Sequence, residues 1–177
     1  MGEAILAGAV LTIGMFSVIG LITFSYRTTG DTQDLIIASE LAQEGVELVR
    51  NVRDNNLVYR EKNKAGACAS STAGLCDPFN GFDSGGNIRC SIDYDGPFDC
   101  ANPNPALQLT GGFYQHTGTT GRYYRVIKTI SSGLGIDTRY RVQSFVTWQD
   151  PGNNLNPAWC TTFNKCVYTE LFLTAWK

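Results

Sequence analysis

The sequence has little charge and few groups that titrate near neutrality. Charged residues make up 17% of the 177 residues, the formal net charge is -2, and His116 is the one histidine. So small a negative charge gives no electrostatic attraction to nucleic acid or to anionic lipid headgroups. We therefore expect no nucleic-acid partner.

Common catalytic and phosphate-binding motifs are also missing. The chain contains no GxSxG, HExxH, GxGxxG or Walker-type loop. His116 lies in QHTGTTG without a cysteine or serine nucleophile motif beside it, and we interpret it as a solvated loop residue. We expect neither an enzyme nor a bound cofactor.

One acidic stretch raises the question of a metal. The turn DYDGPFD carries Asp93, Asp95 and Asp99 around a glycine. Carboxylates spaced in this way can bind Ca2+, but the twelve-residue loop with its terminal glutamate is absent. An ordinary turn is the simpler interpretation. Calcium is therefore a weak alternative, and we expect no other metal.

The chain does contain an even number of cysteines, all after its N-terminal third. They are Cys68, Cys76, Cys90, Cys100, Cys160 and Cys166. Behind an apolar N-terminal segment, this indicates disulfides formed in an oxidising compartment. Reduced thiols and zinc are the alternatives, and zinc is poorly supported because no CxxC pair occurs. We predict the three local pairs, 68–76, 90–100 and 160–166, each stabilising by about 2–3 kcal/mol.

The chain also contains a long apolar run at its start. Ala4 to Phe24 carries no ionised side chain, and Glu3 is the only charge before Arg27. About 20 apolar residues cross a bilayer as a helix. A signal peptide has a basic start and a shorter apolar core, which this segment lacks, whereas a plain membrane anchor remains an open alternative.

Residues 31–56 continue with an amphipathic helical pattern. Apolar and small side chains recur at steps of three and four, which places them on one helix face. These residues are Leu35, Ala38, Ala42, Gly45, Val49 and Val52. Asp31 is a suitable N-cap, and the small residues on this face predict close packing on a sheet.

No proline separates the two helical segments. They therefore predict one near-continuous helix of about 53 residues and about 80 Å. Gly14, Gly20 and Gly30 are the positions at which this helix can bend or break.

The rest of the chain divides into a loop-rich region, 57–120, and a strand-rich region, 121–177. The first is rich in Gly, Asn, Ser, Asp and Pro. The second contains runs of β-branched and aromatic residues at 122–130, 138–148 and 166–176. We predict an antiparallel sheet of three or four strands with one face on the amphipathic helix.

The predicted fold is therefore α+β. Residues 1–28 form an apolar helix. Residues 29–177 form a head, in which the amphipathic helix packs on a small antiparallel sheet with disulfide-closed loops.

The chain resembles the type IV pilin and pseudopilin family in three features. These are an apolar helix with one acidic residue near its start, an amphipathic continuation of that helix, and a sheet that carries disulfides. GEAILAGAVLTIGMFSVIGL is similar to the family's N-terminal segment. LAQEGVELVRNVRDNN and LFLTAWK resemble pilin-like proteins of candidate-phylum bacteria. The resemblance covers the N-terminal helix and, less closely, the C-terminal strand, and 57–120 lies outside it.

The resemblance implies a subunit that lies in the inner membrane and is processed and N-methylated. A pilus assembly machinery then packs its apolar helices into a helical filament of many copies on the cell surface. In the family, a glutamate at the fifth mature residue pairs with the N-terminal amine of a neighbouring subunit. The matching residue here is Glu3, which would pair with Met1 of a second copy. Either two residues are missing before Met1 or Met1 is the mature end. No leader is visible, and we expect the mature form.

The sequence thus favours the structural subunit, more specifically the major subunit, of an extracellular filament. A minor pilin or a secretion-system pseudopilin is the nearest alternative. A single-pass, membrane-anchored extracytoplasmic binding module is the alternative of a different class. Adhesion and motility are downstream roles that the sequence does not rank.

Overall fold

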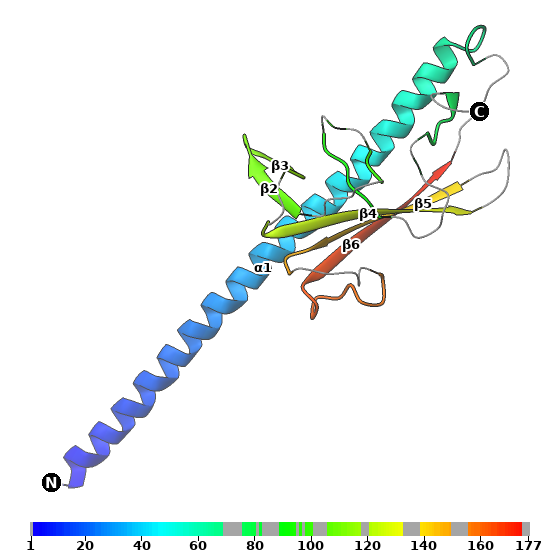
Figure 1. Ribbon diagram of the computed structural model, residues 1–177. Coiled ribbons are helices and arrows are strands. Elements are labelled where there is room, and N and C mark those ends of the chain that lie inside the picture. Colours follow the sequence, from blue (N-terminus) through cyan, green and yellow to red (C-terminus); the bar gives the residue numbers. More distant parts are fainter. Residues whose placement is uncertain are drawn as a thin grey trace. The chain divides into compact units, whose positions relative to one another are not determined.

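The computed structural model describes residues 2–68, 76–80, 82, 89–94, 96, 98–100, 106–117, 121–132, 139–149 and 156–174. It confirms the α+β fold, with one long helix and an antiparallel sheet (Figure 1). The sheet has six strands, and the described residues include three disulfides. The chain forms two compact units, Met1–Ile36 and Ile37–Lys177. The division falls inside the helix, further along the chain than the boundary expected at residue 28.

Helix α1 runs from Gly2 to Lys62 without interruption. Asp31, expected as an N-cap, lies inside it, because no second helix begins there. The helix also passes through Gly14, Gly20 and Gly30 without a break, since an isolated glycine costs only about 1 kcal/mol relative to alanine. That the helix can bend or break at these glycines stays a prediction.

The end of α1 was predicted too early, at residue 56. Asn56 lies inside the helix, and its side-chain amide donates to the carbonyls of Pro78 and Asn80 at 3.3 and 3.4 Å. The helix ends at Lys62, with Arg60 and Lys62 in the last turn, where cations complement the helix dipole. Asn63 then donates its side-chain amide to the Tyr59 carbonyl at 2.8 Å.

The sheet contains six strands among the described residues, more than the three or four expected. They are β1 (Arg89–Cys90), β2 (Ala106–Thr110), β3 (Phe113–Gln115), β4 (Tyr123–Ser132), β5 (Arg139–Thr147) and β6 (Cys166–Thr174). Their order is β3-β2-β4-β5-β6, and β1 also pairs with β4. The three long strands confirm the predicted strand region. The three short ones lie within 57–120, where loops were expected.

A two-residue turn joins β2 to β3. Gly111 and Gly112 have φ values of 62° and 91°, the left-handed pair that a type I′ hairpin turn requires. TGGF between two short apolar runs is a hairpin signal that was read as a loop. The hairpin forms one edge of the sheet, and β6 forms the other (Figure 1).

The second half of α1 packs on one face of β4 and β5. Register places Ile127 opposite Ser144 and Arg125 opposite Val146, so these four share the face toward the helix. A Cβ built on Gly45 would press on Ser144 Oγ and lie 3.0 Å from Ile127 Cδ1 and 3.1 Å from Arg125 Cδ. The helix therefore approaches the sheet as closely as a backbone without a side chain permits.

Most of the predicted stripe on the helix is buried. Ala38, Ala42 and Val49 are fully buried in two apolar clusters, and Gly45 is buried between them. Leu35 and Val52 are half-buried. Fully burying a Val, Leu, Ile or Phe side chain is worth about 1.5–3 kcal/mol, so these clusters supply much of the head's stability.

The opposite face of the sheet is covered as well. Val126 and Phe145 are buried there with the disulfide of Cys160 and Cys166, and Trp159 packs on this cluster. The 160–166 loop thus provides an apolar layer on the face of the sheet away from α1.

All three predicted disulfides are present. They join Cys68 to Cys76, Cys90 to Cys100, and Cys160 to Cys166. Cys90 is fully buried in the largest apolar cluster, and Cys166 is buried on the other face of the sheet. The bridges therefore differ in how deeply they enter the core.

Gly45→Ala tests the close approach of helix and sheet. Overpacking costs about 1–3 kcal/mol, and the better helix propensity of alanine returns up to about 1 kcal/mol. We expect a net loss of about 1–2 kcal/mol in the free energy of unfolding, measured by urea unfolding of the full chain in mild detergent. Adding Ser144→Ala should recover part of the loss, because Ser144 Oγ has no hydrogen-bond partner in the described structure. Gly30→Ala, with nothing within 4 Å of its Cβ, is the matched control and should not destabilise.

The disulfides should contribute unequally to the free energy of unfolding. Replacing both Cys90 and Cys100 by alanine should lower the free energy of unfolding by about 3–5 kcal/mol, because the loop constraint and core packing are both lost. The same change at Cys68 and Cys76 should cost about 2–3 kcal/mol. Urea midpoints of the two double variants decide this, and equal midpoints would show that burial of Cys90 adds nothing.

Candidate functional site

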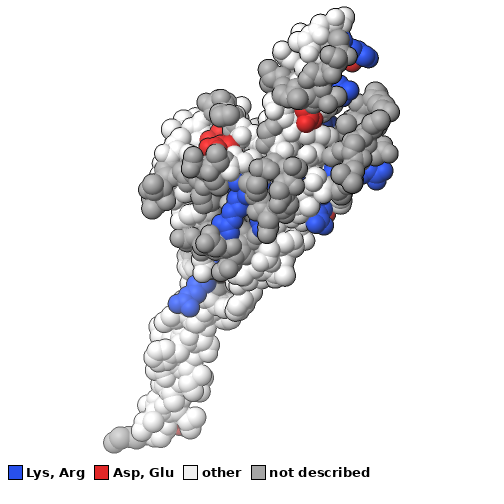
Figure 2. Space-filling view, turned by 45° about the vertical axis from the view of Figure 1, so that its right-hand side comes forward, with Lys and Arg blue, Asp and Glu red and all other residues white. Residues whose placement is uncertain are grey.

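The apolar segment, Ala4–Phe24, belongs to a helix with no buried surface at this end. Every residue from Gly2 to Thr29 is exposed, and α1 is long and apolar enough to cross a membrane. Figure 2 shows this end of the molecule as an almost unbroken uncharged surface. A helix that is apolar all round is stable only inside a bilayer or among other apolar helices.

Polar side chains within and just beyond the apolar segment bond to the helix itself. Ser17 and Thr23 donate to the carbonyls of Ile13 and Ile19, each at 2.9 Å. Thr12 donates in the same way to Ala9 at 2.9 Å. Since lipid offers no partner, hydroxyls must be satisfied internally there. The segment therefore presents a surface that requires no water.

Glu3 is the exception to this pattern. It lies exposed in the first turn of α1 and makes no ion pair with another described residue. A carboxylate in the first turn is favoured by the helix dipole, but in a hydrocarbon or helix-bundle interior it needs a cation. Met1, the predicted partner in a second copy, lies outside the described residues.

A fully buried arginine in the head bonds to groups on several elements. Arg125 on β4 is 0% exposed. Its Nη1 lies 3.0 Å from Glu44 Oε1, and its Nη2 donates to the Ile92 carbonyl at 2.7 Å and lies 4.0 Å from Asp93 Oδ1. Glu44 is 44% exposed, so water stabilises its charge and weakens its attraction to Arg125. The arginine thus links α1, β4 and the segment after β1.

His116 is not the solvated residue that was expected. Its side chain is 3% exposed, and Nδ1 lies 2.6 Å from Asp93 Oδ1. The His116 backbone N–H donates to both Asp93 oxygens, at 3.0 and 3.2 Å. The pair ties the end of β3 to the turn before Tyr94. The contact therefore holds the His116 ring inside the head.

Burial lowers the pKa of His116 below its ordinary value of 6.5, and the positive charge of Arg125 lowers it further. The hydrogen bond to Asp93 acts in the opposite direction but is the weaker influence. The imidazole is therefore neutral at pH 7. With a carboxylate beside it, Nδ1 carries the proton and donates to Asp93.

These contacts change the interpretation of the acidic turn. Asp93 accepts bonds from His116 and lies near Arg125, so it faces cations and donors rather than an open loop. Asp99 forms an isolated β-bridge with Ser91, and Asp95 lies outside the described residues. Among the described residues, no group of three or more His, Cys, Asp or Glu could hold a metal ion.

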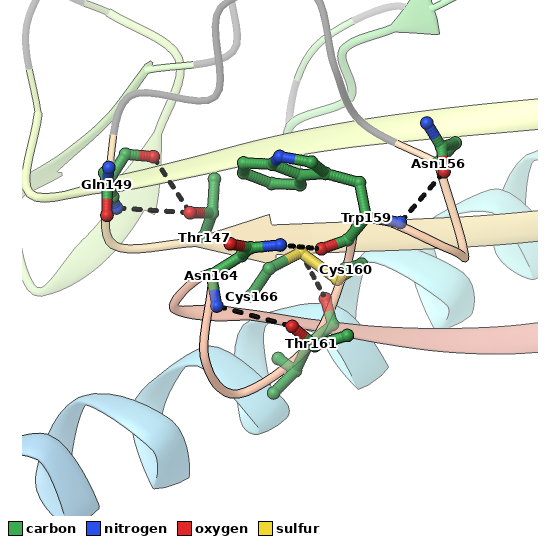
Figure 3. The surroundings of a disulfide bond; sticks show 9 residues. Thr147, Gln149, Asn156, Trp159, Cys160, Thr161, Asn164 and Cys166 are labelled. Carbon is green, nitrogen blue, oxygen red and sulfur yellow. Dashed lines mark hydrogen bonds between the residues drawn. A yellow bond between two sulfur atoms is a disulfide. The ribbon is translucent and has the colours of Figure 1, made fainter.

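The loop closed by Cys160 and Cys166 is held by its own hydrogen bonds (Figure 3). Asn164 donates its side-chain amide to the Trp159 carbonyl at 2.6 Å and its backbone N–H to Thr161. Lys165 has a φ of 51°, the left-handed conformation that closes the loop into β6. The result is a fixed turn at the edge of the sheet.

Arg125 could have been found from the sequence, because it alternates with Tyr123 and Ile127 and therefore points to the same face of its strand. The pairing of His116 with Asp93 carries no sequence signal, since the two are 23 residues apart on separate segments.

The chain matches no protein-family model, curated protein or solved structure in our comparisons. The apolar helix is of the kind that anchors a protein in a membrane or serves as a signal sequence, and the disulfides indicate an extracytoplasmic location.

Acidification should destabilise the head through His116. Because its folded pKa is lowered, the unfolded chain binds a proton below about pH 6.5 that the folded chain does not. The free energy of unfolding therefore falls as the pH drops below this value. His116→Asn should remove the pH dependence above about pH 5, where carboxylates begin to protonate. NMR of the single imidazole gives its pKa directly, and titration above 6.5 would contradict the prediction.

Proposed function

We propose that this protein is the structural subunit of an extracellular, type IV pilus-like filament and assembles through the N-terminal part of α1. The observation that supports it best is the apolar segment, which is exposed throughout and internally satisfied. The sequence resemblance to type IV pilins leads to the same proposal. The inner membrane would hold the subunit before assembly, and other copies would cover the segment afterwards.

Glu3 would set the axial position of each subunit. An unpaired carboxylate inside a hydrocarbon or helical core costs at least about 2.5–3.5 kcal/mol. The N-terminal amine of a second copy offsets this cost only when the two groups meet, and removing one partner of a buried pair typically costs about 3–5 kcal/mol. Such a pair favours one register among the many that apolar packing alone permits.

A single-pass anchored binding module would use the same apolar helix without polymerising. A minor pilin or secretion pseudopilin would polymerise only with other subunits. The three possibilities differ in what shearing releases from the cell surface.

The first experiment is electron microscopy of sheared cell-surface material, with mass spectrometry of the fibres. We expect thin, uniform fibres whose main chain is this protein, with an N-methylated first residue. This protein as a trace component of fibres would favour the minor subunit. Its recovery only as a membrane-bound monomer would favour the anchored module and contradict the proposal.

Glu3→Ala should abolish fibres or disorder their helical symmetry, because the register-setting charge is lost. Glu40→Ala, which removes an exposed carboxylate from the part of α1 that lies in the head, is the matched control and should assemble normally. Fibre yield by sedimentation and symmetry by image analysis provide the measurements. Normal yield and symmetry in Glu3→Ala would contradict the role of Glu3.

A further inference from the structure

The apolar segment changes character within a few residues at its C-terminal end. Phe24 ends the uncharged apolar run, Tyr26 follows with 77% of its surface exposed, and Arg27 is the first Lys or Arg of the chain. From Thr28 to Gln33 the helix carries polar side chains and one glycine. An apolar run, an amphipathic ring, a cation and a polar stretch thus follow one another in the order in which a bilayer changes from hydrocarbon to water.

Tyr26 and Arg27 have no partner in the part of the chain that the structure describes. Neither side chain makes a hydrogen bond, an ion pair or a ring contact with another described residue. Asp31 lies one turn after Arg27, but a base followed by an acid at this spacing is the weaker order on a helix, and the two do not pair. Arg27 therefore offers its charge and its donors to the surroundings of the segment.

The residues that follow Arg27 would not by themselves stop the helix from entering hydrocarbon. The hydroxyls of Thr28 and Thr29 donate to the carbonyls of Phe24 and Ser25 at 3.0 and 2.9 Å, so they need no water. The next charge is that of Asp31. Arg27 is thus the first group after the apolar run that is costly to bury in lipid.

The length of the segment relates Arg27 to Glu3. The helical rise of 1.5 Å per residue places these two residues about 36 Å apart along α1. A tilt of about 20° reduces the span across the bilayer only to about 34 Å, still more than the hydrocarbon core of about 30 Å. With Arg27 at one headgroup layer, Glu3 therefore reaches the other, and both charges stay hydrated.

A second copy is the other surface that would cover this end of the segment, and a bilayer fits the observations better. Phosphate oxygens surround the helix at headgroup depth in every direction, so Arg27 meets them whatever the rotation of the helix. A second copy has to present a carboxylate at one place, and its own apolar segment, Ala4–Phe24, contains none.

We infer that Tyr26 and Arg27 fix the depth of the unassembled subunit in the membrane, with Arg27 bound to phospholipid phosphate and the Tyr26 ring at the level of the headgroups. A guanidinium binds phosphate through two parallel N–H groups, and every phospholipid carries this phosphate, so the contact requires no excess of anionic lipid. The inference rests on the membrane stage of the proposed function and not on the filament.

Solid-state NMR of the full chain in phosphatidylcholine vesicles tests the phosphate contact. Arginine is isotopically labelled at its guanidinium carbon, and dipolar coupling to lipid phosphorus reduces the signal of a guanidinium in contact with phosphate. We expect this reduction in the parent chain and its loss in Arg27→Gln. Arg50→Gln is the matched control and should keep the reduction, because Arg50 is 41% exposed on α1 but is bonded to Glu47.

The depth is measured in phosphatidylcholine nanodiscs with a water-soluble gadolinium chelate, which broadens the NMR signals of residues that water reaches. We expect broadening from Thr28 onward and little at Phe24. Arg27→Leu should move this boundary toward Asp31 by up to about 6 Å along the helix, because the first costly charge is then four residues further on. Arg50→Leu should leave the boundary in place, and thermal unfolding of each variant shows whether the head is intact.

Arginine signals that lipid phosphorus does not reduce would overturn the inference, as would a boundary that stays in place in Arg27→Leu. A boundary that shifts with the amount of protein per nanodisc would assign the depth to contact between copies and would also overturn it. A chain that does not enter vesicles contradicts the membrane stage together with this inference. Absence of fibres from sheared cells contradicts the filament alone, since an anchored module would keep the same depth.

Discussion

The close contact between α1 and the sheet at Gly45 is the constraint on which the rest of the head depends. Without a side chain at this position, the helix lies directly on Ser144, Ile127 and Arg125. Arg125 is thereby enclosed between helix and sheet, where its guanidinium meets Glu44 on one side and the Ile92 carbonyl on the other. A bulkier residue would separate the layers and leave a buried charge with poorer partners.

The parts of this fold that sequence patterns predicted are those that depend on local periodicity. The stripe containing Ala38, Ala42 and Val49 recurs at helical spacing, and 122–130, 138–148 and 166–176 are rich in β-branched and aromatic residues. The disulfides were predicted because each closes a short loop. In these cases the determining residues lie within a few positions of one another.

The parts that were missed depend on segments distant in the sequence. β1 is two residues long and exists only because β4 offers it an edge. The second face of the sheet is buried because the 160–166 loop folds back over Phe145. The sequence pattern of β5 alone does not indicate this burial. His116 looked solvated because its neighbours are Gly and Thr, whereas its environment is provided by Asp93 and Arg125. The Gly111–Gly112 hairpin is different: its signal was present and was read as loop composition.

The proposed filament makes a specific demand on the apolar segment, which must exchange a bilayer for a core of other helices. A continuous helix satisfies its own backbone, and Thr12, Ser17 and Thr23 satisfy their hydroxyls internally. The exchange therefore requires no hydrogen bond to break. Among the described side chains from Gly2 to Phe24, Glu3 alone carries a charge whose free energy differs strongly between the two environments. The Glu3 carboxylate, which is costly to bury without a cation, thus favours one register of the helices among the many that apolar packing alone permits.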